Sequence, residues 1–153
     1  MQSSQQQIIS QVDQWLQRAK PVWLCTILKT WGSSPRPIGA MMACTTDGEL
    51  VGSVSGGCIE EDFISQLQDG SLKSQFDLKA KPFVVQYGKT EEEQARLRLP
   101  CGGQLHVLLE YIEPNTANLA TFVRLISDLE GHKEVSRVVD LSNGNISATD
   151  HSN

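Results

Sequence analysis

The sequence has no long apolar run and little positive charge. No stretch of its 153 residues approaches the roughly 20 apolar residues that a membrane-spanning helix needs. Its first residues also lack the basic start and apolar core of a signal peptide. Lys and Arg number 13 against 18 Asp and Glu, a net charge of −5, whereas a general nucleic-acid binder needs clustered cations. We therefore expect a cytoplasmic protein that binds neither nucleic acid nor membranes.

Cysteine is sparse, and its spacing disfavours a structural zinc site. Cys25, Cys44, Cys58 and Cys101 include no CxxC pair, the spacing typical of such sites. In the cytoplasm we expect these cysteines to be free thiols. The remaining composition is that of a globular protein, with 39% apolar and 20% charged residues. A chain of this length forms one domain with a core of its own.

Helical and strand patterns alternate along the chain. Apolar residues at three- and four-residue steps predict helices, and β-branched apolar runs predict strands. Helices are expected over 8–20, 59–70 and 119–131, and strands over 22–28, 40–46, 49–54, 83–87, 105–112, 135–141 and 145–149. Interleaved elements of this kind predict an α/β fold, a layered mixed sheet with flanking helices in a single domain over 1–153.

Turn and cap signals connect these elements. Asp47-Gly48 and Asn143-Gly144 suit tight hairpins, the first as a type I′ turn. Two prolines and a glycine predict that Thr30–Ile38 is loop. Thr90–Glu93 is typical of a capping box that opens a short helix.

Glycine is concentrated next to a predicted helix start. The amides of Ser55, Gly56 and Gly57 could form an anion-binding concavity there, and the helix dipole would add positive potential. A tight strand-to-helix turn explains the same residues. The GK[ST] ending and the GxGxxG spacing are both absent, which excludes a P-loop and a dinucleotide fingerprint. Arg36, between two prolines, is either a bidentate anion ligand or a solvated loop residue.

Two of the cysteines adjoin Gly-Gly pairs. Cys58 follows one and Cys101 precedes another, and a thiol at a helix N-terminus gains thiolate character. Such thiols could attack, carry sulfur or bind a soft metal, or could simply be buried apolar residues. A metal site of Cys58, Cys101 and His106 is a rival reading. We expect Cys25 and Cys44, inside strand patterns, to be core residues.

Three segments together resemble a known family. Gly32-Ser33-Ser34-Pro35-Arg36, then Gly52 to Glu60, and finally Pro100-Cys101-Gly102-Gly103 occur in the order seen in the N-terminal domain of the XdhC/CoxI family. These proteins are accessory and maturation factors for xanthine dehydrogenase, carbon monoxide dehydrogenase and related molybdenum hydroxylases. The similarity runs from about residue 15 to residue 110.

The resemblance implies a chaperone that binds the molybdenum cofactor (molybdopterin), protects it, supports its sulfuration and delivers it to a hydroxylase. Cys58 and Cys101 would then contact sulfur or molybdenum, with no metal site independent of the cofactor. The expected cofactor-binding residues are Ser33, Ser34, Arg36, Ser55, Gly56, Gly57, Cys58, Glu60, Cys101, Gly102 and Gly103. The family's C-terminal Rossmann-type domain is not found within these 153 residues, so NAD binding is not expected.

Two other functions remain open on the sequence. The protein could be a sulfurtransferase in which Cys58 or Cys101 carries a persulfide, or a docking module that binds no cofactor. We expect an accessory protein rather than a turnover enzyme. Its expected partners are a molybdenum hydroxylase of the xanthine or carbon monoxide dehydrogenase type, a cysteine desulfurase as sulfur donor, and a second copy in a homodimer.

Overall fold

A computed structural model describes residues 4–31, 39–54, 58–79, 81–97, 104–131, 135–139, 141 and 146–150. The helices are α1 (Ser4–Gln17), α2 (Cys58–Gln68), α3 (Ser71–Lys79), α4 (Glu91–Arg96) and α5 (Thr116–Glu130). The strands are β1 (Val22–Trp31), β2 (Met41–Thr45), β3 (Leu50–Gly52), β4 (Phe83–Tyr87), β5 (Gln104–Ile112), β6 (Val135–Val139) and β7 (Ile146–Asp150).

Five strands form one sheet in the order β3-β2-β1-β5-β4. Each pairing in it is antiparallel. The two longest strands, β1 and β5, lie next to each other, and their register pairs Val22 with Ile112 at one end and Trp31 with Gln104 at the other. A bulge interrupts the ladder between Ile27 and Lys29. The expected layered α/β class is confirmed, but the described sheet is antiparallel throughout and not mixed.

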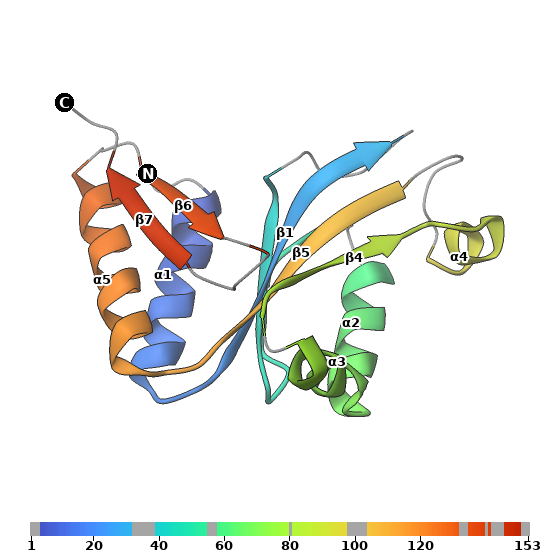
Figure 1. The fold of residues 1–153 in the computed structure, drawn as a ribbon, viewed down its shortest axis with the longest axis horizontal. Helices are drawn as coiled ribbons and strands as arrows, with labels where there is room; N and C mark the ends of the chain where they lie inside the picture. The colour runs from blue at the N-terminus through green and yellow to red at the C-terminus, as the bar shows by residue number, and fades with distance from the viewer. Residues whose placement is uncertain are drawn as a thin grey trace.

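Helices cover both faces of this sheet, with α1 and α5 on one side and α2 and α3 on the other (Figure 1). Successive side chains of a strand point to opposite faces. In β1, Trp23, Cys25 and Ile27 therefore pack with the α2/α3 layer, whereas Val22 and Leu24 pack with the α1/α5 layer. A strand buried on both faces needs a continuous apolar run, and 22–28 is mostly apolar for this reason.

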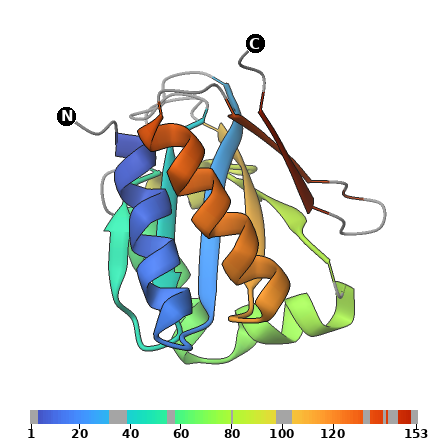
Figure 2. The same cartoon turned by 90° about the vertical axis from the view of Figure 1, so that its left-hand side faces the viewer.

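The α1/α5 layer consists of two helices that run side by side (Figure 2). In α1 the residues Ile8, Val12, Trp15 and Leu16 are buried at helical spacing. They pack with Phe122 and other apolar residues of α5.

Gly52 of β3 must be glycine, because its φ is +82° and a Cβ there would collide with the Met41 carbonyl oxygen.

The α2/α3 layer is built around aromatic rings. Trp23 is fully buried and has Phe63, Phe76 and Tyr111 around it, at ring-centroid distances of 6.2, 5.9 and 4.8 Å. The first two contacts are edge-to-face, an arrangement that aromatic pairs prefer. These rings fix α2 and α3 against the sheet.

The strands β6 and β7 pair only with each other among the described strands, as an antiparallel hairpin. This hairpin lies on the α1/α5 side of the sheet (Figures 1 and 2). Arg137 of β6 connects it to the main sheet by an ion pair with Glu110 of β5, with 2.5 Å between Nη2 and Oε1. None of the described helices is long and apolar enough to cross a membrane.

Three expectations about the elements need correction. Thr30 and Trp31 belong to β1 and not to the loop, because β5 is long enough to pair with them. The Asp47-Gly48 turn is not type I′. Gly48 has a φ of +92°, but Asp47 is not among the described non-glycine residues with positive φ, and the Gly48 N–H instead donates to the Thr45 carbonyl. The helix α3 was not expected, because its apolar periodicity is weak.

Most of the other elements agree with the sequence patterns. The hairpins β2–β3 and β6–β7 form as expected. Thr90 caps α4, since its Oγ1 accepts from the Glu93 N–H at 3.1 Å. The Glu93 carboxylate reaches the Gly88 N–H at 2.6 Å, and not the cap residue as in a standard capping box.

Candidate functional site

Two of the predicted site residues, Cys58 and Glu60, are among those that the structure describes. The other predicted positions lie outside the described residues: Ser33, Ser34, Arg36, Ser55, Gly56, Gly57, Cys101, Gly102 and Gly103. The described residues that flank them still show where each of these segments leaves and rejoins the fold. These flanking residues locate the candidate site.

The first and third segments adjoin neighbouring positions in the sheet. Segment 32–38 directly follows Trp31, the last residue of β1, and segment 98–103 directly precedes Gln104, the first residue of β5. Trp31 and Gln104 are paired across the ladder. The two segments consequently start and finish next to each other, although several helices and strands separate them in sequence order.

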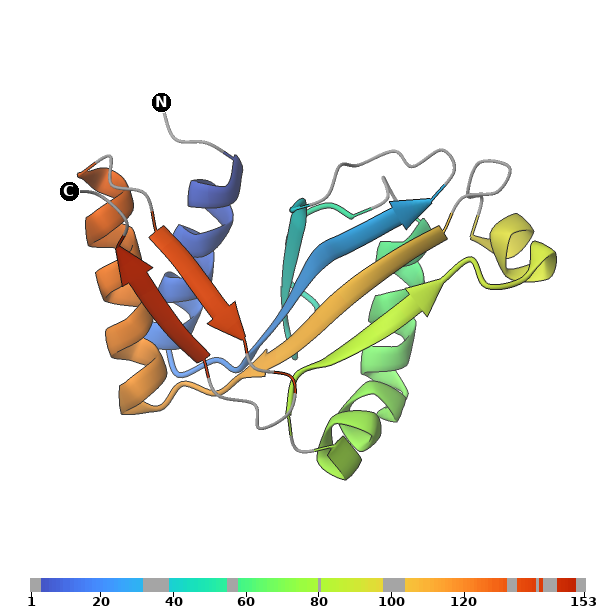
Figure 3. The ribbon, with the colours of Figure 1, turned by 45° about the horizontal axis from the view of Figure 1, so that its top comes forward.

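The second segment, 55–57, adjoins the same end of the sheet. It directly precedes Cys58, the first residue of α2, and this helix start lies near the start of β5 (Figure 3). Asp62 in α2 accepts a hydrogen bond from Arg96, the last residue of α4, at 2.8 Å. Arg96 is in turn close to the point where segment 98–103 begins. We call this region, defined by Trp31, Cys58, Arg96 and Gln104, the motif end.

Glu60 stabilises the chain around segment 55–57. Its carboxylate is buried, with 6% of the residue exposed. Its Oε1 accepts a hydrogen bond from the Val54 N–H at 3.3 Å. This bond joins the residue before the segment to the first turn of α2. The structure thus gives Glu60 a bracing role, and its contact with a cofactor remains a prediction.

Cys58 differs from the other described cysteines in its access to solvent. It is partly exposed at the first position of α2, as the sequence predicted, and lies at the positive end of the helix dipole. Cys25 and Cys44 are buried core residues, which confirms the prediction for them. Burial raises the pKa of the Cys44 thiol to about 12 and that of Cys25 well above its usual value. Both are therefore protonated and unreactive at neutral pH.

Metal ligation by this region has no support from the part of the chain that the structure describes. No three His, Cys, Asp or Glu side chains there could hold a metal ion together. Cys101 lies outside the described residues, so the Cys58, Cys101 and His106 arrangement stays an untested alternative.

A shallow hollow of about 270 Å³ lies beside Glu60, between Leu50 of β3 and Ile64 of α2.

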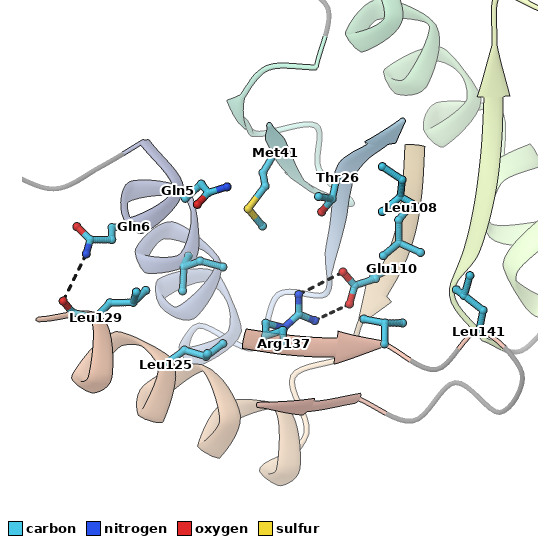
Figure 4. A pocket seen from close by; sticks show the side chains of 13 residues that line it. Gln5, Gln6, Thr26, Met41, Leu108, Glu110, Leu125, Leu129, Arg137 and Leu141 are labelled. Carbon is cyan, nitrogen blue, oxygen red and sulfur yellow. Dashed lines mark hydrogen bonds and ion pairs between the residues drawn. The ribbon is translucent and has the colours of Figure 1, made fainter. Parts of the chain in front are cut away.

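A larger cavity, which the sequence did not predict, lies on the opposite face of the sheet. Its volume is about 440 Å³, and it is bounded by β1, β2, β5, α1, α5 and β6 (Figure 4). Glu110 and Arg137 meet at its edge. The available signal was a carboxylate within the mostly apolar 105–112 run. Its partner could not be read from sequence, because that contact depends on where the β6–β7 hairpin docks.

Comparison with known proteins shows what the chain is similar to. Residues 15–76 match the model of the XdhC and CoxI family. The chain is 30% identical over 114 residues to the molybdenum cofactor insertion chaperone PaoD of Escherichia coli strain K12, a match that covers 72% of this chain and 32% of that protein. It is 29% identical over 102 residues to a Bacillus subtilis strain 168 protein described as a probable subunit of xanthine dehydrogenase, and this match covers 66% of this chain and 29% of that one.

A solved structure also resembles this chain in fold. The fold matches the crystal structure of a protein described as a xanthine dehydrogenase from Bacillus halodurans, with a TM-score of 0.63 and 29% identity. That match covers 90% of this chain and 39% of the other. The chain spans about a third of the length of the curated relatives it matches.

Proposed function

Because the chain belongs to the XdhC and CoxI family, we propose that it is a maturation factor that binds the molybdenum cofactor as cargo. In this proposal it protects the cofactor, supports its sulfuration and delivers it to a molybdenum hydroxylase of the xanthine dehydrogenase type. The proposal takes this chain as the N-terminal domain of the family and includes no NAD site.

The observation that carries the proposal is the convergence at the motif end. Three segments predicted to bind a cofactor adjoin Trp31, Cys58 and Gln104. The sheet register pairs Trp31 with Gln104, and the start of α2 lies near the start of β5 (Figure 3). Residues spread over roughly half of the chain can therefore act on one ligand. A binding module needs such a convergence, whereas three independent tight turns do not.

Within this arrangement each group has a proposed task. The partly exposed Cys58, together with Cys101, would contact the soft molybdenum–sulfur centre. Arg36 and the amides of 55–57 would bind the cofactor's phosphate, because a helix N-terminus and a guanidinium both favour an anion. Glu60 would keep segment 55–57 in place through its bond to Val54. The remaining predicted residues would line the same site: Ser33, Ser34, Gly102 and Gly103.

Cofactor retention tests the proposal directly. The purified chain is mixed with molybdenum cofactor released from a donor enzyme, excess is removed, and retained pterin is measured by fluorescence after oxidation. We expect stoichiometric retention by the wild type. Cys58→Ala, Cys101→Ala and Arg36→Ala should each lower it at least about tenfold, the loss of a charge-assisted or metal contact. Cys25→Ala, which removes a buried thiol, is the matched control and should retain the cofactor.

Two outcomes would count against the proposal. Absence of retention by folded wild type would remove cofactor binding and leave the docking and sulfur-transfer functions. Unchanged retention in both the Cys58 and Cys101 variants would remove the thiol role.

Sulfur transfer is the second candidate, and the exposure of Cys58 favours it. Persulfide labelling after incubation with a cysteine desulfurase separates it from simple binding. A transfer function requires a persulfide on Cys58 or Cys101 that disappears in the corresponding Ala variant, whereas binding alone leaves both thiols unlabelled. Pull-down of the hydroxylase without cofactor tests the docking function, and the oligomeric state of the chain tests the proposed homodimer.

A further inference from the structure

The strand β4 forms one edge of the five-stranded sheet, and no other described strand pairs with its outer side (Figures 1 and 3). An unpaired edge presents N–H and C=O groups that can bind another strand, and natural edges often carry a lysine, a proline or a bulge that prevents this. The five residues of β4 include no charge and no proline, and their register with β5 is continuous. This edge is therefore open to pairing.

The register shows which backbone groups face outward. Ile27 of β1 makes both of its backbone hydrogen bonds with the chain just before β2, so its neighbour Thr26 faces β5, where its partner is Leu108. Leu108 thus bonds to β1, and Val84, which lies opposite Leu108 in β4, turns its own groups away from the sheet. Gln86, two residues further on, has the same orientation. Both residues are exposed.

Both ends of the outward edge are closed. Pro82 lies at one end and has no N–H to donate. At the other end the Gly88 N–H donates to the Glu93 carboxylate at 2.6 Å, and the Gly88 carbonyl accepts from Gln94 Nε2 at 3.0 Å. Between these ends the open edge consists of two N–H groups and two carbonyl groups, which have no partner among the described residues.

This short edge is complementary to itself. If two copies pair in antiparallel fashion about a two-fold axis at Val85, Val84 of each copy lies opposite Gln86 of the other. All the open groups of both copies are then used in four N–H···O bonds. A shift of two residues in either direction would place one of them opposite Pro82 or Gly88, whose groups are missing or already bonded. One register is therefore favoured over its neighbours.

The charges beyond the strand match in the same register. Lys79 and Lys81 precede β4, whereas the stretch 89–93 that follows it has one lysine and three glutamates and is negative. Antiparallel pairing directs the first stretch of each copy towards the second stretch of the other. Glu91 and Glu92 are exposed there. Opposite charges would thus approach each other at both ends of the contact.

We propose that the outer edge of β4 pairs with β4 of a second copy of this chain, so that the sheets of the two copies form one continuous sheet. The contact is small, so the dimer dissociates on dilution. The inference gives a surface to the homodimer in the proposed function, and it rests on no contact with the cofactor.

Analytical ultracentrifugation of the full chain, from about 1 μM to about 1 mM, tests the association. Val84→Pro removes one outward N–H per copy, and therefore two bonds per dimer, but no bond within the chain. We expect it to weaken the dimer at least about tenfold. Val84→Thr keeps the N–H and the branched shape and should change the affinity less than about twofold. Urea unfolding verifies that each variant is folded, and a wild type that stays monomeric throughout would overturn the proposal.

A pair of double variants tests the register. Val84→Lys with Gln86→Glu places opposite charges across the two-fold axis, and Val84→Lys with Gln86→Lys places like charges there. We expect the first to dimerise at least about tenfold more tightly than the second. General repulsion between copies predicts the reverse order, because the first variant keeps the net charge of −5 and the second lowers its magnitude. Equal affinities, or the reverse order, would contradict this register.

A disulfide at the two-fold axis tests the location. In this register Val85 lies opposite Val85 in a non-hydrogen-bonded pair, in which the Cα atoms are about 4.5 Å apart, close enough for a disulfide. Val85→Cys should therefore link two copies on mild oxidation, with peptide mass mapping to identify the bond. Leu78→Cys, at an 88% exposed position of α3, is the control and should not link to itself.

The outcomes separate this inference from the proposed function. A dimer without the link at position 85 would assign the contact to another surface and overturn the inference. A monomeric chain that retains the molybdenum cofactor would overturn the inference alone. A linked dimer that retains no cofactor would support the inference and count against cofactor binding.

Discussion

The same strands contribute to both faces of the sheet, but the two faces are packed differently. On the α2/α3 face, aromatic rings and alternate residues of β1 and β5 fill the space around Trp23. On the α1/α5 face the same two strands contribute Thr26 and Glu110 to a cavity of about 440 Å³. A tightly packed layer stabilises a single structure, whereas an open layer leaves room for a ligand. The comparison indicates that the two faces of one sheet are packed to different densities, and that the α2/α3 face contributes more to stability.

The largest expected effect comes from two adjacent residues of β5 that point to opposite faces. Leu109 is fully buried in the aromatic layer, and Leu108 lines the cavity. We expect Leu109→Ala to lower the free energy of unfolding by about 4 kcal/mol and Leu108→Ala by about 2 kcal/mol, because only the first creates a new void. Urea unfolding measures both, and equal losses would mean that the two faces are equally packed.

A second prediction concerns ion pairs with different burial. Arg137→Met leaves the Glu110 carboxylate buried without a partner, and we expect a loss of about 3 kcal/mol in unfolding free energy. Lys20→Met removes the exposed pair with Glu49 and serves as the control, with a far smaller effect. A double variant, Glu110→Leu with Arg137→Met, should recover much of the loss. If it does not, packing of the arginine stem, and not the unpaired charge, is responsible.

The third prediction uses alkaline pH to probe the aromatic layer. Burial raises the pKa of Cys44 to about 12 and also raises the pKa values of Cys25 and Tyr87. The folded state therefore holds protons that the unfolded state releases. Stability is fully present below about pH 9 and falls as pH rises from there towards 12, by up to about 1.4 kcal/mol per pH unit for each group. Cys44→Ala should make this decline shallower in urea titrations at successive pH values, and an identical decline would exclude the thiol.

The fourth prediction, with the smallest expected effect, concerns the reactivity of the thiols in the folded protein. Iodoacetamide at neutral pH should alkylate Cys58 in the folded protein and leave Cys25 and Cys44 unmodified until denaturant is added, because only Cys58 of the three is partly exposed. Peptide mass mapping gives the extent at each site. Rapid modification of Cys44 in the folded state would show that the aromatic layer opens more readily than its packing indicates.

Much of the fold could be predicted from the sequence because its signals are local. The buried strand 22–28, the capped helix after Thr90 and both hairpins follow from patterns within short stretches of the chain. The helix α3 was missed because Leu72 is its only fully buried residue, so it lacks a clear apolar face. The extension of β1 to Trp31 depends on pairing with β5, which lies far along the chain.

In the candidate site, too, local features could be predicted from the sequence and contacts between distant segments could not. The sequence identified Cys58 at a helix start, and the structure confirms that position. It could not show that segments 32–38 and 98–103 adjoin paired residues, since strand register is a tertiary property. Nor could it show the Glu110–Arg137 pair, whose members are 27 positions apart and meet only after the hairpin docks.

The cavity also depends on contacts between residues that are far apart in the sequence. Gln6 of α1 donates a hydrogen bond to the Leu129 carbonyl of α5 across 123 positions of sequence, and both residues line the cavity. Closing a loop of this length costs conformational entropy before the contact gains free energy. The β1–β5 pairing has the same character, because its partners lie 73 to 90 positions apart. The cavity is therefore complete only when α1 has docked against α5, so that two helices far apart in the chain share one wall.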